Sequence, residues 1–200
     1  MQLLKFNTFC SISGFFAIIF CLSACNLDNR IQNTKALAEE MNSHKIKRVT
    51  SAQISTIVDD WGNRIIKKAQ QELSNSLTKN PEQTSDLCSL KNIAEIDSLE
   101  KKYGVTISLL TSKDIQNQSL SSKERELLDA YLYNSKNNTS LTSNIQNLGN
   151  GVMIYNAPVP ANLNICKSCA VESDLVVWRI KFQKQEVIKR VDAKSLLKMK

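Results

Sequence analysis

The residues best suited to chemistry in this sequence are cysteines, and two of them, Cys166 and Cys169, have C-x-x-C spacing. That spacing occurs in covalent haem attachment, in redox-active dithiols, in short disulfides and in zinc sites. Covalent haem attachment also requires a histidine directly after the second cysteine, to bind the iron. Here that position is Ala170. The motif therefore has the two thiols of a haem attachment site without its iron ligand.

The other interpretations of the cysteines stay open at this stage. In an oxidising compartment Cys166 and Cys169 can close into a small disulfide, and Cys88 is then either a buried thiol or a partner for one of them. A redox-active dithiol needs its first cysteine at a helix N-terminus, whereas this pair follows a proline-containing loop and precedes a β-rich segment. Cys88, Cys166, Cys169 and His44 could compose a zinc site, but their spacing does not favour one, so no metal site is predicted.

Conventional catalytic groups are scarce. His44 is the single histidine of the sequence and lies in a polar stretch, where a solvated surface residue is expected. The sequence contains no glycine-rich phosphate loop, no G-x-S-x-G elbow and no H-E-x-x-H motif. Asp59 and Asp60 are adjacent, so on a helix their side chains point about 100° apart and cannot converge on one substrate. We therefore predict no catalytic residues and a protein that is not an enzyme.

The N-terminal segment predicts export. An apolar run over residues 12–22 is too short to span a bilayer and has the length of a signal-peptide core. It ends in Leu22-Ser23-Ala24-Cys25, which resembles the lipobox of bacterial lipoproteins. This resemblance implies removal of residues 1–24 and attachment of the chain to a membrane through lipid on Cys25. Because Asn26 stands where an inner-membrane retention signal often has Asp, we expect the outer membrane, with the domain facing the periplasm.

Length and composition favour one folded domain after this leader. The 200 residues are 42% hydrophobic, and the 5 Gly and 3 Pro exclude collagen-like and low-complexity chains. The net charge is +7, with many of the basic residues near the C-terminus. An exported protein meets little nucleic acid, so we interpret the basic residues as a solvated helix face and predict no nucleic-acid partner. The predicted organisation is a signal peptide (1–24), the lipidated cysteine with a polar tether (25–45) and a single domain (46–200).

Periodicity and turn signals predict an α+β fold. The expected helices are 51–78, opened by a capping box at Thr50 and Gln53 and weakened at Gly62, then 90–103, 121–133 and 184–198. The expected strands are 105–110, a hairpin of 141–146 with 152–156 across Gly149-Asn150-Gly151, and 174–182. In the last strand Val176, Trp178, Ile180 and Phe182 alternate with Val177, Arg179 and Lys181, which predicts one core face and one solvated face. Helices packed on an antiparallel sheet follow from this order of elements.

Several motifs together, in order and spacing, resemble one known family. They are Lys47-Arg48-Val49-Thr50 before a long helix that contains Gly62, Cys88, the helix 121–133, the segment GVMIYNAP (151–158), the C-x-x-C motif, and DLVVWRI (174–180). The pattern is similar to a bacterial family of exported, sensor-like c-type haem domains, long labelled a domain of unknown function, and it covers residues 45–190. The resemblance implies a PAS-related α+β fold with a long N-terminal helix. The attachment cysteines of the family fall on Cys166 and Cys169, but its histidine falls on Ala170 and its next glycine on Val171.

These departures imply that the fold is kept and the haem is lost, with residual haem binding as the alternative. We therefore expect a membrane-anchored periplasmic lipoprotein that acts as a binding or interaction module. The former cofactor cleft, walled by the long helix and the hairpin, is expected either to collapse around apolar side chains or to take another small ligand. The alternative is a redox, haem-sensing or electron-transfer protein that uses Cys166 and Cys169. No particular protein partner or oligomeric state is predicted.

Overall fold

The computed structural model describes residues 34–35, 37–38, 40–41, 49–137, 139–170, 175–192 and 195–196. The chain divides into two units, Met1–Lys45 and Ile46–Lys200. In the first unit, the described residues between 34 and 41 are helical. The predicted signal peptide, Cys25 and His44 lie outside the described residues. Within the part of the chain that the structure describes, no helix combines the length and apolarity needed to cross a membrane.

The second unit begins with one long helix, α3 (Ser51–Lys79), close to the prediction. Its capping box is present as expected: the Gln53 amide donates to Thr50 Oγ1 at 3.2 Å, and the Thr50 amide donates to Gln53 Oε1 at 3.0 Å. One face of the helix is buried along its full length by apolar residues at helical spacing, together with Gly62: Ile54, Ile57, Val58, Ile65, Ala69, Leu73 and Leu77. The helix ends at Asn80, where Pro81 begins a short 3₁₀ turn, η2 (Pro81–Gln83).

Four antiparallel strands form one sheet in the order β1-β4-β3-β2. They are β1 (Val105–Thr111), β2 (Asn144–Gly149), β3 (Val152–Pro158) and β4 (Val176–Gln183). The predicted hairpin is confirmed, although β2 begins at Asn144, three residues later than expected, and runs on to Gly149. Gly149, Asn150 and Gly151 have φ of +87°, +50° and +74°, the left-handed conformations that Asn-Gly turns supply. The fold is therefore α+β, as predicted.

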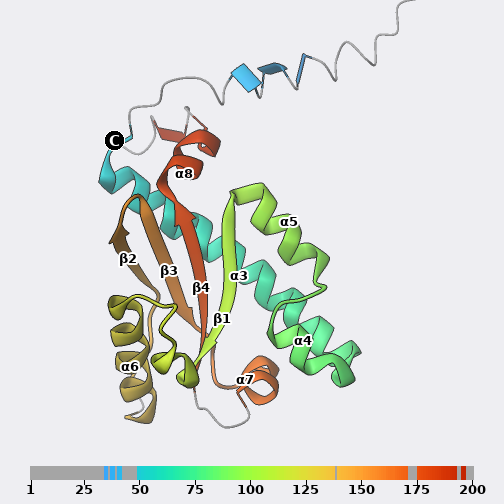
Figure 1. Ribbon diagram of the computed structural model, residues 1–200. Helices are drawn as coiled ribbons and strands as arrows, with labels where there is room; N and C mark the ends of the chain where they lie inside the picture. The colour runs from blue at the N-terminus through green and yellow to red at the C-terminus, as the bar shows by residue number, and fades with distance from the viewer. Residues whose placement is uncertain are drawn as a thin grey trace, which may run out of the picture. The chain divides into compact units, whose positions relative to one another are not determined.

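The sheet separates two layers of helices (Figure 1). On one face α3 crosses the strands and packs against Trp178, Ile180 and Phe182 of β4, which are all fully buried. On the other face lie η3 (Ser112–Gln116) and α6 (Ser122–Lys136). The short helices α7 (Asn164–Cys169) and α8 (Lys184–Arg190) lie at opposite ends of the sheet.

The second helix of the prediction starts later than expected. Residues from 84 onwards form α4 (Thr84–Cys88) and then α5 (Ala94–Tyr103). Between them Leu90 and Asn92 have φ of +58° and +61°, so the backbone cannot continue as a right-handed helix from Leu90. The end is correct: Gly104 has φ +64° and its amide donates to the Glu100 carbonyl.

The prediction that the second face of β4 is solvated is wrong. Val177 is fully buried there, against Leu120, Leu128 and Tyr131 from the segment around α6, and Leu175 joins the same cluster. The side chains of β4 do alternate between the two faces of the sheet, but both faces are covered because α6 packs on the second one. Two apolar residues in succession, Val176 and Val177, were the sequence signal for a strand buried on both sides.

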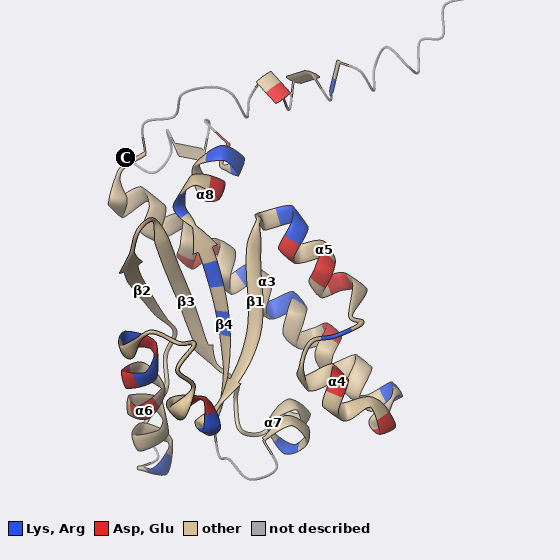
Figure 2. Cartoon of the chain, in the orientation of Figure 1, with Lys and Arg blue, Asp and Glu red and all other residues tan. Residues whose placement is uncertain are grey.

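The terminal helix is described only in part. Helix α8 ends at Arg190, because Val191 is extended with ψ of 135° and neither Val191 nor Asp192 is helical, so the prediction of one continuous helix over 184–198 is wrong. Residues 193–194 and 197–198 of that prediction lie outside the described residues. Within α8, Arg190 forms an ion pair with Glu186 one turn earlier. Figure 2 shows basic and acidic residues interspersed along α5, α6 and α8, so these helices present surfaces of mixed sign.

Candidate functional site

The predicted cysteine site joins two helices through a disulfide. Cys88, the last residue of α4, is bonded to Cys169, the last residue of α7, with a Cα–Cα distance of 5.4 Å. Cys166 is a free thiol on the same short helix. The hypothesis of a small Cys166–Cys169 disulfide is therefore wrong, and pairing of Cys88 with one member of the motif is the alternative that holds. The cysteines lie on a short helix that the sequence analysis did not predict, and Cys166 is its third residue, so the expectation that the pair is not at the start of a helix is wrong.

The free thiol of Cys166 is half-buried beside the loop that precedes α7. It donates to the carbonyl oxygens of Val159 and Pro160 at 3.7 and 3.6 Å. Burial raises the pKa of this thiol above its ordinary value, so at neutral pH it is held protonated. A reactive dithiol requires the opposite shift, because the thiolate is the nucleophile.

The residues of the motif do not fit a covalently attached haem. Thioether attachment needs both thiols, and Cys169 is already bonded to Cys88. The position of the iron ligand is occupied by Ala170, which is buried. The described residues also contain no group of three or more metal-ligating side chains. With two of its three thiols in a disulfide, the hypothetical Cys₃His zinc set lacks the thiolates that it requires.

Helix α7 is fixed to the last third of α3. The Ser74 hydroxyl donates to Asn164 Oδ1 at 2.6 Å, and Asn164 Nδ2 donates to the Ser74 carbonyl at 3.1 Å. A shallow depression of about 220 Å³ beside this contact is lined by Gln70, Gln71, Ser74, Asn75 and Leu163. Its lining is nearly all polar and carries no charge.

A larger pocket lies at the other end of α3. Its volume is about 330 Å³, and it lies between the first turns of the helix and the tip of the β2–β3 hairpin. The described residues that line it are Ser51, Ile54, Ser55, Ile145, Asn147, Gly149, Asn150, Gly151, Met153 and Lys184. A cleft is therefore present between the long helix and the hairpin, but it does not lie beside the cysteines at which the resembled family attaches its cofactor.

The pocket and the cysteines are separate sites. Ile54 lines the pocket and Ser74 contacts α7, and their separation of twenty positions corresponds to about 30 Å of helix. Figure 1 shows the same separation, with α8 at one end of the sheet and α7 at the other. A group attached at Cys166 could not also fill this pocket, so the structure does not bring the two predicted features together.

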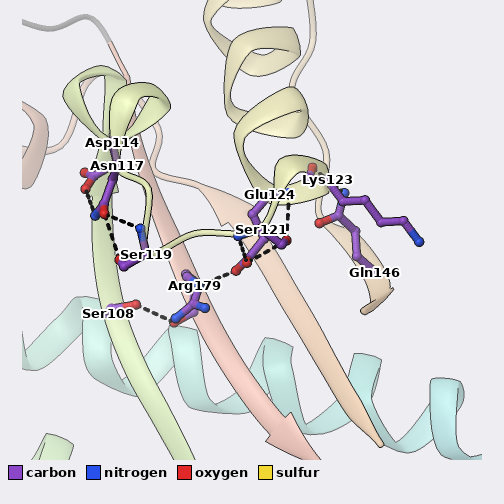
Figure 3. Close-up of polar contacts among 9 residues, drawn as sticks. All are labelled: Ser108, Asp114, Asn117, Ser119, Ser121, Lys123, Glu124, Gln146 and Arg179. Atoms are coloured by element: carbon purple, nitrogen blue, oxygen red, sulfur yellow. Dashed lines mark hydrogen bonds and ion pairs between the residues drawn. The ribbon is translucent and has the colours of Figure 1, made fainter. Parts of the chain in front are cut away.

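A third polar cluster lies under the start of α6 (Figure 3). Glu124 and Arg179 form an ion pair with a distance of 2.7 Å between Glu124 Oε1 and Arg179 Nε, and both side chains are nearly buried. The second carboxylate oxygen of Glu124 accepts from the Ser121 amide at 2.9 Å and from its hydroxyl at 2.8 Å, which makes Glu124 part of the helix cap. Desolvation raises the pKa of Glu124, but the bonds from Ser121 and Arg179 outweigh it and hold the pKa below its usual value.

Two neighbours of this ion pair have buried polar atoms without a hydrogen-bond partner among the described residues. They are Nδ2 of Asn156, which lies beside Arg179 in the β3–β4 register, and Oε1 of Gln146. Gln146 Nε2 does donate, to the Lys123 carbonyl at 3.1 Å. Because Glu124 already neutralises Arg179, we interpret this cluster as a buried network that stabilises the fold and not as a ligand-binding site.

Sequence reasoning missed the residues that give the pocket its polarity. Lys184 was interpreted as part of a solvated basic face, and Ser51 and Ser55 were not singled out at all. No local signal marks them, since they meet only through the hairpin turn. The amide of Lys184 donates to the Gly151 carbonyl at 2.8 Å, and this contact brings α8 to the hairpin tip.

Comparison with known proteins identifies no relative: no protein-family model, no curated protein and no solved structure matches the chain.

Proposed function

We propose that this chain is a membrane-anchored lipoprotein of the bacterial envelope whose folded domain binds a small molecule without transforming it. The observation that carries the proposal is the pocket of about 330 Å³ between α3 and the β2–β3 hairpin. Pockets of this size, formed by few elements and lined by apolar and polar groups together, are the usual form of a small-molecule site. None of the described residues that line it is a His, Cys, Asp or Glu. Ser51, Ser55 and Lys184 could act as nucleophiles, but no described His, Asp or Glu lines the pocket to activate or orient them, so binding has more support than acyl-transfer chemistry.

The anchoring part of the proposal rests on Leu22-Ser23-Ala24-Cys25 and on the disulfide of the folded domain. Structural disulfides persist in exported proteins and are rare in the reducing cytosol. The Cys88–Cys169 bond thus agrees with a periplasmic location. A PAS-like sensor architecture, with a long helix packed across an antiparallel sheet, completes the proposal and is favoured by α3 and the four-stranded sheet. The domain then corresponds to a haem family scaffold without its haem.

Lipid attachment is tested by growing cells with an alkyne analogue of palmitate and visualising the labelled protein on a gel. We expect labelling of the wild-type chain and none of Cys25→Ser. Cys10→Ser removes a cysteine upstream of the cleavage position and serves as the matched control, with labelling retained. Equal labelling of wild type and Cys25→Ser would refute the anchor.

Ligand binding is tested by NMR on the folded domain, with indole, isocaproate, isohexanol and isohexylamine as probes. We expect at least one probe to shift the amide signals of Ser55 and Met153 in the pocket. Ser55→Trp, which fills the pocket, abolishes the shifts, while Thr56→Trp on the exposed side of the same helix turn preserves them. The binding function is wrong if no probe binds, or if binding survives in Ser55→Trp.

A second candidate function is redox chemistry, and one observation favours it. The free thiol of Cys166 lies three residues from the bonded Cys169, so a thiol and a disulfide occur on the same short helix. A visible absorption spectrum of residues 26–200, exported in a host with haem-attachment machinery, separates this function from the first. A Soret band that survives acid-acetone extraction would establish covalent haem and overturn the binding proposal, while a spectrum without bands removes the haem form of the redox candidate.

A further inference from the structure

We infer that the ligand of the α3–hairpin pocket is a small organic anion, with an apolar body on the floor of the pocket and its negative group at Lys184. This inference rests on the proposed binding function and specifies the chemical class of the ligand. It follows from three properties of the pocket: its size, the arrangement of its lining, and its one charged side chain.

The volume limits the ligand to metabolite size. A water molecule in the liquid occupies about 30 Å³, so 330 Å³ corresponds to about eleven waters. A ligand with roughly that many non-hydrogen atoms fills the space. A porphyrin has several times as many atoms, so this pocket could enclose only a small part of it.

The lining is divided into an apolar and a polar part. Ile54, Ile145 and Met153 come from α3, β2 and β3 and face the core side of the sheet, where Ile54 and Met153 are buried. Their side chains offer a hydrocarbon floor that inorganic phosphate cannot use. The polar part consists of the hydroxyls of Ser51 and Ser55 and the amides of Asn147 and Asn150. These groups can fix the orientation of a ligand head group without adding charge.

Lys184 makes the pocket positively charged. It is the single ionisable side chain among the described residues of the lining, and its ammonium has no ion-pair partner among the described residues. The nearby acid of its own helix, Glu186, is paired with Arg190. The first turn of α3, on the opposite wall, contains no acidic residue. An anion entering the pocket therefore meets a positive charge that no described carboxylate offsets.

The test uses three probes that share one carbon skeleton: isocaproate, isohexanol and isohexylamine. Binding to the folded domain is measured by titration calorimetry at low salt. We expect isocaproate to bind about tenfold more tightly than isohexanol, because a hydrogen bond to a charged group at a half-exposed site adds about that factor. Isohexylamine is expected to bind most weakly, and inorganic phosphate to bind more weakly than isocaproate because it leaves the floor uncovered.

Two variants with the same change of net charge test whether the preference for the anion comes from Lys184. Lys184→Gln should reduce the isocaproate affinity to that of isohexanol and leave the isohexanol affinity unchanged. Lys181→Gln removes the same charge from the opposite face of the same sheet and should leave both affinities unchanged. Circular dichroism of both variants confirms that they fold.

The outcomes separate this inference from the function on which it rests. If isohexanol or isohexylamine binds as tightly as isocaproate, or if Lys184→Gln preserves the preference, the anion inference is wrong while the pocket remains a binding site. If phosphate binds as tightly as isocaproate, the ligand is an inorganic anion and the organic class is wrong. If the Ser55→Trp variant still binds isocaproate, both proposals fail.

Discussion

A thiol three residues from a disulfide can change the pairing of that disulfide. Cys166 and Cys169 lie one helical turn apart, and Cβ atoms at this spacing are about 5–6 Å from each other. A disulfide needs its Cβ atoms about 4 Å apart, so α7 must distort before the Cys166 thiolate attacks Cys169, forms a bond within the helix and releases the Cys88 thiolate, with no outside oxidant. The raised pKa of Cys166 opposes this step, because little thiolate is present at neutral pH.

The first prediction concerns this pairing. Trypsin cleaves after Lys167, so Cys166 and Cys169 fall on different peptides, and Cys88 falls on a third. In the wild type, peptide mapping without reductant should find Cys88 linked to Cys169, with Cys166 alkylated. In Cys88→Ser produced in an oxidising compartment, the unpaired Cys169 should pair with Cys166, and the oxidant of that compartment takes up the two electrons and the thiol protons are released. Linkage of Cys166 in the wild-type protein would contradict the assigned bond, and Cys166→Ser should leave the map otherwise unchanged.

The second prediction concerns the buried carboxylate of Glu124. Its folded pKa lies below its unfolded value, so the carboxylate contributes stability that is fully present above the unfolded value and is lost as the pH falls through the folded one. Glu124→Gln leaves Arg179 without its partner, and we expect a loss of about 3 kcal/mol at pH 7.

Urea unfolding at several pH values checks this expectation. The wild type should lose stability as the pH falls from about 5 towards the lowered pKa, and the variant should lose less over the same interval. Glu95→Gln changes an exposed carboxylate on α5 and serves as the control, with a pH profile like that of the wild type. Parallel profiles of wild type and Glu124→Gln would mean that Glu124 is not the titrating group.

At the scale of single elements, Gly62 explains how α3 sits on the sheet. The ring of Tyr155 lies where a side chain at position 62 would be, 2.5 Å from the place of its Cβ. The Tyr155 hydroxyl donates to Asn63 Oδ1 at 2.9 Å, so the same tyrosine is held by the next residue of the helix. Sequence analysis noted Gly62 only as a weak point, whereas the structure makes it a position of close approach between α3 and β3.

The third prediction follows from this close approach. On helix propensity alone, Gly62→Ala would stabilise α3 by about 1 kcal/mol. We expect a net loss of about 1–3 kcal/mol instead, because the methyl group displaces the buried Tyr155 ring. Thermal unfolding measures the difference. Lys67→Ala, at an exposed position of the same helix, should change the stability by less than about 0.5 kcal/mol. A stabilised Gly62→Ala protein would show that the ring moves at no cost.

The helices and strands that sequence reasoning predicted well are determined by residues close together in the sequence. The capping boxes at Thr50 and Ser121 mark the starts of α3 and α6, and Asn150-Gly151 sets the hairpin, so a few neighbouring residues suffice in each case. The start of α5 was misplaced because Leu90 takes a left-handed conformation that its residue type does not favour. Only tertiary packing explains such a backbone.

The candidate sites were harder to predict, since they depend on segments distant in sequence. The cysteines were identified, but the choice between Cys88 and Cys166 as partner of Cys169 is made by the packing of α4 on α7. Likewise Lys184 reaches the pocket only through its contact with the hairpin, and Arg179 was placed on a solvated face because α6 was not known to cover it. Spacing within one segment carries no information on such contacts.

At the scale of the whole molecule, the Cys88–Cys169 disulfide is a covalent cross-link between distant parts of the chain. It joins residues 81 positions apart, and the loop that it closes contains three of the four strands. Our fourth prediction is that removing the bond costs about 2–5 kcal/mol, chiefly because the unfolded chain gains freedom. Urea unfolding with and without reductant measures this loss. A Cys88→Ala/Cys169→Ala variant should match the reduced protein, and Cys166→Ser should match the oxidised one. Equal stability of the oxidised and reduced proteins would contradict the prediction.

Because the disulfide lies near one end of α3, the two ends of this helix are held with different firmness. Near its C-terminus the helix is held by α7, through Asn164, and α7 is covalently linked to α4. Near its N-terminus the described contacts are noncovalent, among them the bond from Gln53 Nε2 to the Leu196 carbonyl at 3.2 Å. Partial opening that preserves the disulfide should therefore start at Thr50 and spread towards Gly62. Amide hydrogen exchange along α3 would then be fastest at the end that lines the pocket. A ligand bound there would slow this exchange, so filling the pocket would also stiffen the long helix.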